Sequence, residues 1–560
     1  MALSATHPQP HFRHNPMAAI TNRLKQVLLS VRLFSRLVIQ IPLRAYQVEP
    51  AQAVIESCLG QKGLEFLWVF PRQSGKDEAI AQLCTFLLTL FQRVEAAIIH
   101  VYPTGGQIAT GVGRLENRLE NLWTSGHWWS KAKPTRRGLG LSQIAFFSGH
   151  PQARAEGATA NLLLIINEVQ DQDEAIVERR FTPMRASANA TALYVGTVRT
   201  TGDFLWKTKS RLEKQQRRDG QQRVFILTAH QVGQENRHYK TFVAGQVAKY
   251  GRQHPVVKTE YYGEPVDVAA GLFPRRRLTL MQGDHPRLSQ PQPGQVYIAL
   301  IDVGGQDEGA TEAFAELENP ERDYTCCTIV RAIARPGEIG PRYEAVDVFA
   351  DQGSRHFQEH PGRPSLFEQM VAYLRHWRVA AVVIDSSGVG QGISDALGEK
   401  LSQPVFPFDF SKNHGKSRLG NNFLAIIETG RFKYFTEGRG EKGEGRGEKT
   451  SPPAGGTEGG RKLHPEELSD RWWFFTQAEH CGYELAPGVP IERGMRWGVP
   501  ASAKVYVDVD KTSHPVHDDR LLSAALLAEA DERIRQGDLF LSSGQSAVIQ
   551  RERKRDDKWS

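Results

Sequence analysis

The sequence predicts two α/β domains joined by a proline-rich segment. Residues 64–195 alternate between apolar runs typical of buried strands and helical stretches, the pattern of a parallel α/β domain. Pro274 and the proline-rich stretch from Pro286 to Pro293 mark a boundary, and a second alternation starts at Val296. The 560 residues also exceed the roughly 250–300 residues at which a single core stops growing.

The composition is that of a globular protein and excludes several other classes. Hydrophobic residues make up 40% and charged residues 24%, which rules out a mostly disordered, collagen-like or coiled-coil chain. The formal charge of +7 permits a polyanionic partner without demonstrating one. Five cysteines without CxxC or Cys/His spacing make a zinc site and a disulfide framework unexpected, which fits a reducing compartment.

Residues 1–45 form a basic arm with six Lys and Arg residues and no Asp or Glu. One face of its predicted helix is apolar and is made of Leu24, Val27, Leu28, Val31 and Val38. Three interpretations stay open: a helix docked on its own domain, a helix that grips a partner or an anionic surface, and a targeting presequence. The apolar run Val27–Leu43 is interrupted by Arg32 and Arg36, so no run reaches the roughly 20 residues needed to cross a bilayer.

The first domain is expected to span residues 46–265. Its predicted strands are Leu64–Phe70, Ala96–Tyr102, Leu162–Ile166 and Ala192–Val195. Each is a short apolar run of the length that buried parallel strands have. Residues 208–265 are more polar and helix-rich, which indicates a lid or subdomain. Residues 266–294 are expected to form a linker.

The second domain is expected to span residues 295–535. Its first predicted elements are the strands Val296–Ile301, Thr325–Ile333 and Tyr343–Phe349, the helix Ser365–Trp377 and the strand Ala380–Ile384. Three strands, a helix and another strand is the opening order of the ribonuclease-H-like fold. The low-complexity run Gly438–Gly460 predicts a disordered surface insertion, and residues 536–560 a charged tail.

Residues Phe70–Glu78 follow a predicted strand and open a predicted helix. Backbone N–H groups at a helix N-terminus make a cradle for phosphate, and Lys76 is placed to reach the β and γ phosphates. The strict GxxxxGK[ST] pattern fails at Phe70 and Asp77, so a tight turn with a solvated lysine stays open. The candidate nucleotide-binding residues of this loop are Arg72, Gln73, Ser74, Gly75, Lys76 and Asp77.

The apolar run Leu162–Ile166 continues into Asn167 and Glu168. A buried parallel strand would deliver Glu168 to the sheet edge, where it could orient or deprotonate the water that attacks the γ-phosphate. A helix N-terminal carboxylate is the alternative. Two weaker signals accompany it: Gln47 could read the adenine edge or be a surface glutamine, and Thr197 could sense the γ-phosphate or belong to a turn.

Asp77 and Asn167 both depart from the usual phosphate-loop pattern. The residue after the loop lysine usually supplies a neutral hydroxyl to Mg²⁺, and the residue before the catalytic glutamate usually supplies an aspartate carboxylate. We hypothesise that the carboxylate has changed sides, so that Asp77 and Asn167 together replace the usual pair. In the alternative, Asp77 is only a first-turn carboxylate that the helix dipole favours.

Four aspartates form a second candidate site. Asp302 and Asp385 each end an apolar strand, and Asp518 and Asp519 open a helix rich in Leu and Ala. Converging carboxylates are hard oxygen ligands for Mg²⁺ or Mn²⁺, and two such ions could activate water and stabilise the leaving oxygen of a phosphodiester. Each aspartate alone also fits a turn or a helix cap. Two further candidates, expected to be turn residues, are Asp307 and Asp323.

Over roughly residues 44–530, these motifs resemble the large terminase subunit of tailed bacteriophages, the ATPase–nuclease of DNA packaging. In the first half the resemblance rests on Pro71–Lys76, Asn167–Asp171, Gly196-Thr197 and Phe204–Trp206. In the second half it rests on Asp302, Asp385–Gly388, Phe408–Ser411, Lys416-Ser417 and His517–Asp519.

The resemblance implies roles for the ATPase residues. Lys76 would bind the ATP phosphates and Arg72 would sense or polarise them. Glu168 would be the catalytic carboxylate, and Thr197 would couple hydrolysis to DNA movement. The cofactors would be ATP and Mg²⁺.

The resemblance also implies nuclease ligands and partners. Asp302, Asp385 and Asp518 would bind Mg²⁺, with Mn²⁺ as a possible substitute and Asp519 as a neighbour or replacement ligand. The partners would be double-stranded DNA, a small terminase subunit and the portal ring of a procapsid. The chain would form a homo-oligomer on the portal, act in the host bacterial cytoplasm and engage no membrane.

Two other functions stay open. A helicase–nuclease or transposase-like recombinase would share both folds, and duplex unwinding by the purified protein would favour it. A catalytically degenerate prophage relic would bind DNA or a partner, but would not hydrolyse ATP with or without DNA.

Overall fold

The computed structural model describes residues 24–133, 135–152, 157–304, 323–335, 337–359, 364–437, 469–486, 488–506 and 513–541. The chain divides into two compact units. The first comprises Met1–Val243 with Lys258–Val266, and the second comprises Ala244–Val257 with Asp267–Ser560. Among the described residues, no helix combines the length and the apolar character needed to cross a membrane.

The first unit is built on one eight-stranded sheet with the order β3-β4-β5-β2-β6-β7-β1-β8. Its strands are β1 (Glu65–Val69), β2 (Ala97–Tyr102), β3 (Trp128–Lys131), β4 (Arg136–Leu139), β5 (Ser142–Ser148), β6 (Leu163–Asn167), β7 (Thr191–Gly196) and β8 (Val224–Ile226). The central strands run in parallel and are fully buried, as expected of continuous apolar runs. Because β7 lies between β1 and β6, the ends of these three strands share one sheet edge.

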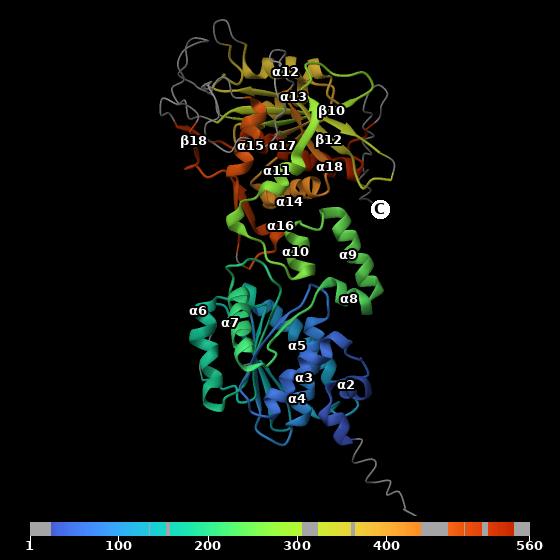
Figure 1. The fold of residues 1–560 in the computed structure, drawn as a ribbon, viewed down its shortest axis with the longest axis vertical. Helices are drawn as coiled ribbons and strands as arrows, with labels where there is room; N and C mark the ends of the chain where they lie inside the picture. The colour runs from blue at the N-terminus through green and yellow to red at the C-terminus, as the bar shows by residue number, and fades with distance from the viewer. Residues whose placement is uncertain are drawn as a thin grey trace, which may run out of the picture. The chain divides into compact units, whose positions relative to one another are not determined.

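Helices cover both faces of this sheet. On one face lie α3 (Ala45–Leu59), α4 (Lys76–Leu90) and α5 (Gly105–Leu119), and on the other lies α7 (Phe204–Asp219) (Figure 1). The sequence predicted β1, β2, β6 and β7 to within two residues at each end. It missed the meander β3–β5, whose strands β3 and β4 contain charged residues and so show no apolar run.

The described part of the basic arm packs against the first unit. Residues 24–29 are helical and are followed by α2 (Val31–Phe34) and the π-helical turn Ser35–Ile39. The buried ring of Phe34 lies edge-on to Phe86 and Trp123, at 5.1 and 5.8 Å between ring centres. Of the three interpretations, the docked helix describes these residues, and residues 1–23 lie outside the described part.

The helix-rich segment 208–265 contains one strand of the sheet, β8, as well as helices. The helices after α7 are α8 (Ala229–Glu235), α9 (Arg237–Tyr250) and α10 (Pro255–Tyr262). β8 pairs in parallel with β1, so part of the expected lid belongs to the main sheet. Residues 244–257 group with the second unit.

The second unit is built on a seven-stranded sheet with the order β14-β13-β10-β11-β12-β15-β9. Its strands are β9 (Gln282–Pro286), β10 (Val296–Asp302), β11 (Thr325–Ile333), β12 (Arg342–Asp351), β13 (Ala381–Asp385), β14 (Val405–Phe408) and β15 (Phe432–Thr436). β10, β11 and β12 are antiparallel neighbours, whereas β13 and β14 run parallel to β10. This is the ribonuclease-H-like arrangement that the sequence predicted.

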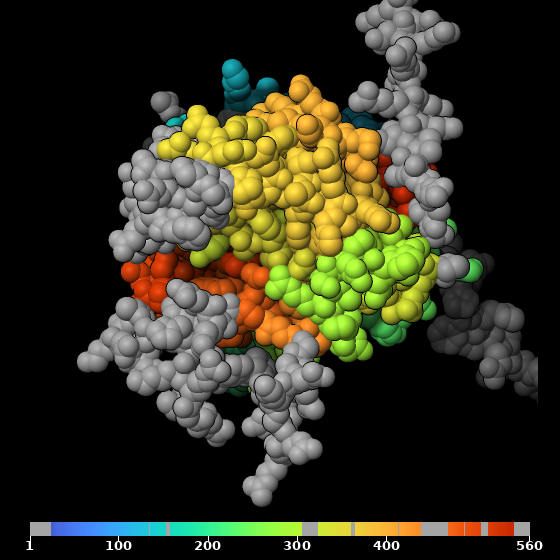
Figure 2. Space-filling model, turned by 90° about the horizontal axis from the view of Figure 1, so that it is seen from above, coloured from blue at the N-terminus to red at the C-terminus, as the bar shows by residue number. Residues whose placement is uncertain are grey.

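Helices also cover both faces of the second sheet. One core contains Tyr297, Ala299 and Ile301 with α12 (Leu366–Trp377) and α13 (Gly390–Lys400). The other contains Ile298 and Leu300, which alternate with them along β10. It packs against α11 (Arg275–Met281), α14 (Gly415–Glu428), α15 (Asp470–His480), α17 (Asp519–Ala525) and α18 (Leu527–Gln536). In Figure 2 the yellow to orange segments, which include α12 and α13, form a continuous surface of this unit.

Smaller elements complete the second unit. They are the hairpins β16 (Gly482–Leu485) with β17 (Met495–Gly498) and β18 (Lys504–Tyr506) with β19 (Ser513–Pro515), and the short helix α16 (Ile491–Gly494).

The segment 266–294, expected to be a linker, differs from that expectation. It contains α11 and β9, and Leu272, Phe273 and Met281 are buried in the core of the second unit. β9 is the outermost strand of its sheet, where a proline is tolerated because no neighbour needs its N–H. The insertion 438–460, Asp307 and the tail beyond residue 541 lie outside the described residues.

Candidate functional site

The predicted phosphate loop, residues 70–75, connects β1 to α4 with a strained turn. Gln73 and Gly75 have φ values of 61° and 86°, in the left-handed region. A Cβ on Gly75 would lie 2.7 Å from Gln47 Nε2, so glycine is needed there for space as well as conformation. Ser74 Oγ donates to the carbonyl of Pro71 at 2.7 Å, which turns this side chain back onto the loop.

Two side chains of α3 hydrogen-bond to carbonyl groups of the loop. Tyr46 Oη donates to the Ser74 carbonyl at 2.9 Å, and Gln47 Nε2 donates to the Gly75 carbonyl at 2.9 Å. Gln47 Oε1 accepts the Arg44 N–H at 2.9 Å. Both ends of the Gln47 amide are therefore engaged within the chain. Gln47 therefore braces the loop and is buried, so it is not the surface glutamine of the alternative, and its contact with adenine stays a prediction.

Lys76 and Glu168 form the central ion pair of the first site. Lys76 Nζ lies 2.6 Å from Glu168 Oε1, and the lysine is buried. Burial alone would lower the pKa of Lys76, but the carboxylates of Glu168, Asp77 and Glu260 together raise it above its usual value. Burial likewise would raise the pKa of Glu168, but Lys76, the hydrogen bond from Gln170 and Arg199 together hold it below its usual value. Both groups therefore carry charge at neutral pH.

Glu168 occupies a position of backbone strain at the end of β6. Its φ of 47° is in the left-handed region, which is unfavourable for a residue with a Cβ and is typical of functional sites. The strained turn leads into the 3₁₀ helix Val169–Asp171 and aims the carboxylate at the loop rather than along the strand.

Gln170 links Glu168 to the end of β7. Its Nε2 donates to Glu168 Oε2 at 2.7 Å, and its Oε1 accepts the Thr197 N–H at 3.0 Å. A Cβ on Gly196 would lie 2.2 Å from Gln170 Oε1, so the glycine makes room for this amide. No role for Gln170 was predicted from the sequence. The available signal was its position two residues after the predicted catalytic Glu168.

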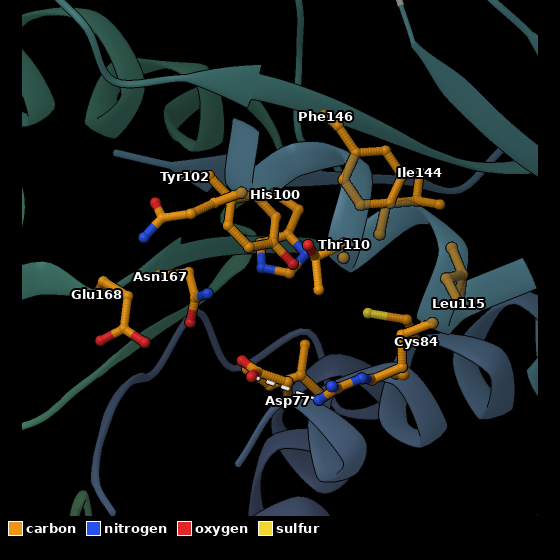
Figure 3. Close-up of a pocket in the computed structure, with 15 residues that line it drawn as sticks. Asp77, Cys84, His100, Tyr102, Thr110, Leu115, Ile144, Phe146, Asn167 and Glu168 are labelled. Carbon is orange, nitrogen blue, oxygen red and sulfur yellow. Dashed lines mark ion pairs between the residues drawn. The ribbon is translucent and has the colours of Figure 1, made fainter. Parts of the chain in front are cut away.

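Asp77, Asn167 and Glu168 line one cavity of about 160 Å³ between α4, α5 and the sheet (Figure 3). Asp77 Oδ2 lies 3.3 Å from Arg114 Nη1, an ion pair across α4 and α5. Asn167 is buried, and its Oδ1 has no hydrogen-bond partner among the described residues. A carboxylate and an unsatisfied amide oxygen facing one cavity suit a hard cation such as Mg²⁺.

Arg72 lies away from this cavity. Its side chain is 54% exposed and its Nη1 is 3.9 Å from Glu260 Oε2. Its backbone N–H donates to the Glu260 carbonyl at 2.8 Å. The structure thus holds the Arg72 backbone in place and leaves its guanidinium at the surface of the loop.

The second site gathers the four predicted aspartates at one edge of the second sheet. Ile301 and Ile384 are register partners on the parallel strands β10 and β13, so the next residues, Asp302 and Asp385, end adjacent strands. Asp519 opens α17 and accepts the Tyr324 N–H at 3.1 Å.

The four aspartates interact electrostatically. Burial raises the pKa of Asp302 well above its usual value, and the charges of Asp519, Asp385 and Asp518 raise it further. Burial and then the charge of Asp323 raise the pKa of Asp519 to about 7. Such repulsion is relieved when a divalent cation binds.

The cluster does not form a closed metal site in this conformation. Within the described ranges, no group of three or more His, Cys, Asp or Glu side chains is arranged to hold a metal ion. The donor set nevertheless fits Mg²⁺ or Mn²⁺ by chemistry and by charge.

Asp323 belongs to the edge of this cluster, although the sequence favoured a turn residue. Its Oδ1 lies 2.8 Å from His517 Nδ1. The hydrogen bond with His517 is the main cause that lowers the pKa of Asp323, and the same bond raises the pKa of His517. No sequence pattern indicated this pair, because Asp323 and His517 are far apart along the chain.

Comparisons with known proteins find similarity only among solved structures. No protein-family model matches the chain, and no curated protein matches it. The large terminase of a thermophilic bacteriophage in complex with ADP is 10% identical, over 87% of this chain and 99% of that chain, with a TM-score of 0.38. The HK97 bacteriophage large terminase is 12% identical, over 88% and 96%, with a TM-score of 0.33.

A third structure matches part of the chain. The large terminase nuclease from thermophilic phage G20c with bound magnesium is 13% identical, over 46% of this chain and 96% of that chain, with a TM-score of 0.28. At these identities and TM-scores, function has to be inferred from the side chains of this chain.

Proposed function

We propose that this chain is a viral DNA-packaging motor subunit. The first unit hydrolyses ATP to move double-stranded DNA into a procapsid, and the second cuts concatemeric DNA with a metal-dependent endonuclease. One observation carries the proposal: a phosphate-loop lysine paired with a strand-end glutamate and a four-aspartate cluster on a ribonuclease-H-like sheet occur in one chain.

The loop and the ion pair account for the ATPase chemistry. The loop N–H groups and Lys76 bind the phosphates, so Lys76 must leave Glu168 when ATP arrives. Glu168, freed from the lysine, orients the attacking water and accepts its proton. Mg²⁺, which Asp77 and Asn167 would hold, supplies neutralisation of the phosphate charge.

Gln170 couples this step to the rest of the unit. When Glu168 exchanges Lys76 for water, the amide that donates to Glu168 shifts, and with it the acceptor of the Thr197 N–H. Thr197, which follows β7, therefore responds to whether Glu168 is paired with Lys76 or with water. This proposal replaces the expected sensing by the Thr197 hydroxyl with sensing through its backbone.

The aspartate cluster accounts for the nuclease chemistry. Asp302, Asp385 and Asp518 would hold Mg²⁺ or Mn²⁺, with Asp519 beside them, and the metal supplies water activation and charge neutralisation. Asp519 Oδ2 accepts the Tyr324 N–H, which fixes the orientation of this carboxylate. The partners follow from this function: DNA, a small terminase subunit and the portal ring, on which the chain assembles as a homo-oligomer.

Two assays on one preparation of the full chain test the function. ATP hydrolysis is measured with and without duplex DNA, and plasmid cleavage is measured with Mg²⁺, with Mn²⁺ and with excess chelator. We expect DNA-stimulated hydrolysis and cleavage that the chelator abolishes. Duplex unwinding would instead indicate a helicase–nuclease, and absence of both activities would indicate a degenerate chain.

A further inference from the structure

Lys416 lies in the first turn of α14, and its ammonium group faces the aspartate cluster. Its Nζ is 3.7 Å from Asp518 Oδ2 and 5.5 Å from the centre of the Trp497 indole ring. The side chain is 39% exposed, so the ammonium group is accessible to a ligand that reaches the cluster. The mechanism proposed above gives this residue no role.

Hydrogen bonds fix the Lys416 backbone relative to Asp385. The Lys416 N–H donates to the Phe410 carbonyl at 3.1 Å, and the Phe410 N–H donates to Ser387 Oγ at 3.1 Å. The Ser387 N–H donates in turn to Asp385 Oδ1 at 2.8 Å. A continuous series of hydrogen bonds therefore connects the Lys416 backbone to Asp385, the proposed metal ligand at the end of β13.

Trp497 fixes the other side of the lysine. Its Nε1–H donates to the Lys416 carbonyl at 2.6 Å, and its ring lies beside the ammonium. A Cβ on Gly420 would lie 2.3 Å from Trp497 Nε1, so the indole reaches this position only because residue 420 is glycine. The lysine is thus positioned by packing from two elements, as a functional side chain needs to be.

The ammonium group can exchange one anion for another. Its contact with Asp518 is long and partly exposed, and such ion pairs are weak. Once cations share the charge of Asp518, the attraction between Lys416 and Asp518 falls. The strongest remaining anion at the cluster is then the phosphodiester itself, and a lysine is a compact donor with three N–H groups.

We propose that Lys416 is a catalytic residue of the nuclease whose Nζ binds a non-bridging oxygen of the scissile phosphodiester. The proposal rests on the nuclease function proposed above. In hydrolysis, the water oxygen bonds to phosphorus and one P–O ester bond breaks. The water loses one proton and the leaving oxygen gains one, so no further reactant is needed. The ammonium group stabilises the negative charge that develops on the phosphoryl oxygens.

The alternative role, a counter-ion for Asp518, predicts different cleavage kinetics. If Lys416 were only a counter-ion for Asp518, its removal would leave the carboxylates more negative. Mg²⁺ would then bind more tightly, the half-saturating Mg²⁺ concentration would fall, and the turnover rate at saturating Mg²⁺ would not change.

The experiment compares Lys416→Met, Lys416→Arg and the control Lys412→Met in the full chain. Lys412 is 77% exposed and pairs with Asp409 at 3.0 Å, so its loss removes the same charge from the same segment. Plasmid cleavage is measured against DNA and against Mg²⁺ concentration, and circular dichroism with urea unfolding reports on folding. We expect Lys416→Met to lower kcat by about 10²–10³-fold with KM for DNA within a few-fold, the range seen when one transition-state donor is lost. Lys416→Arg should restore part of the loss, and Lys412→Met should match the wild type.

Each other outcome overturns the proposal. An unchanged kcat, with or without a lower half-saturating Mg²⁺ concentration, would make Lys416 a counter-ion only. An equal loss in Lys412→Met would make the effect one of general charge. Loss of the native circular dichroism signal together with cleavage in both Lys416 variants would indicate a packing role. A wild type that cuts no DNA would overturn the nuclease function and this inference with it.

Discussion

Asp77 of α4 and Asn167 at the end of β6 line the same cavity (Figure 3). The hypothesis that the metal-binding carboxylate has moved from position 167 to position 77 is therefore testable. The unsatisfied Oδ1 of Asn167 supports an oxygen ligand there. The ion pair of Asp77 with Arg114 shows how the carboxylate is neutralised without a metal ion.

The exchange hypothesis predicts the order of four ATPase rates. Asp77→Thr alone should weaken hydrolysis strongly, because no carboxylate then remains at either position. Adding Asn167→Asp should restore much of the rate, so the double variant should exceed Asp77→Thr. The measurement is the ATPase rate and the binding of a fluorescent ATP analogue against Mg²⁺ concentration for the wild type, both single variants and the double.

Glu78 provides the control for this series. It is the next carboxylate in the first turn of α4 and pairs with Arg118 at 2.9 Å. If Asp77 acted only through the helix dipole, Glu78→Gln and Asp77→Thr would have equally small effects. An Asp77→Thr variant as active as the wild type, or no rescue in the double variant, would show that the exchange does not exist.

The Gln170 amide predicts a separation of hydrolysis from its stimulation by DNA. Gln170→Met keeps the side-chain length but removes both hydrogen bonds, to Glu168 and to the Thr197 N–H. We expect basal ATP hydrolysis to fall by roughly 10- to 150-fold at most, since a lost hydrogen bond to a charged group costs roughly 1.5–3 kcal/mol, while stimulation by DNA disappears.

Thr197→Ala is the matched variant, because it removes the hydroxyl and retains the N–H. Stimulation by DNA should persist in it. Loss of stimulation in Thr197→Ala with retention in Gln170→Met would show that the hydroxyl is the sensor and that the amide link is not.

At the scale of elements, the segment 244–257 is held to the second unit by a buried histidine. His254 Nε2 lies 3.0 Å from the Asn421 carbonyl of α14, and the Val256 N–H donates to His254 Nδ1 at 3.2 Å. Nδ1 is therefore an acceptor and the ring is neutral. The pKa of His254 is lowered from 6.5 to about 4, mainly by burial and also by the charge of Arg277, against the opposing effects of the Asn421 carbonyl and Glu428.

This histidine predicts that the free energy of unfolding decreases as the pH is lowered. A depressed pKa means that the unfolded state binds the proton first, so its contribution is complete above about pH 6.5 and is lost as pH falls toward about 4. The loss should approach about 1.4 kcal/mol per pH unit within that window. Urea unfolding of the full chain from pH 5 to pH 8 checks it. His254→Gln, which can still donate to Asn421 and accept from Val256, should flatten this slope, and an unchanged slope would exclude His254 as its source.

At the scale of the whole molecule, the two chemistries belong to different units and should separate. Lys76→Ala removes the cation that reaches the phosphates and should abolish ATP hydrolysis, with plasmid cleavage largely intact. Asp302→Ala should abolish cleavage and retain hydrolysis. Both activities are measured on each variant after circular dichroism confirms folding. Loss of both activities in folded Asp302→Ala would contradict two independent sites.

The metal dependence of cleavage is also a property of the intact chain. Cleavage should need Mg²⁺ or Mn²⁺ and fail with Ca²⁺, because the proposed ligands are all carboxylates and Ca²⁺ accepts looser geometry that misplaces the attacking water. Plasmid cleavage with each ion, and with excess chelator, measures this. Efficient cutting in chelator would contradict a metal-dependent site.

The sequence by itself determined those features that depend on neighbours along the chain. Apolar runs place β1, β2, β6, β7, β10, β11 and β13, because a strand buried on both faces needs a continuous run of apolar residues. The loop before Lys76 and the aspartates at the strand ends follow from the same local pattern. Strands without an apolar run, such as β3 and β4, gave no such signal.

Only the tertiary structure decided which distant side chains meet. It placed β7 between β1 and β6, turned Gln47 toward the loop, joined Gln170 to Thr197, and set Lys416 beside Asp518. It also drew β9 into the second sheet where a linker was expected. These contacts depend on sheet order and on side-chain packing across long sequence separations, and periodicity along the chain carries no information about either.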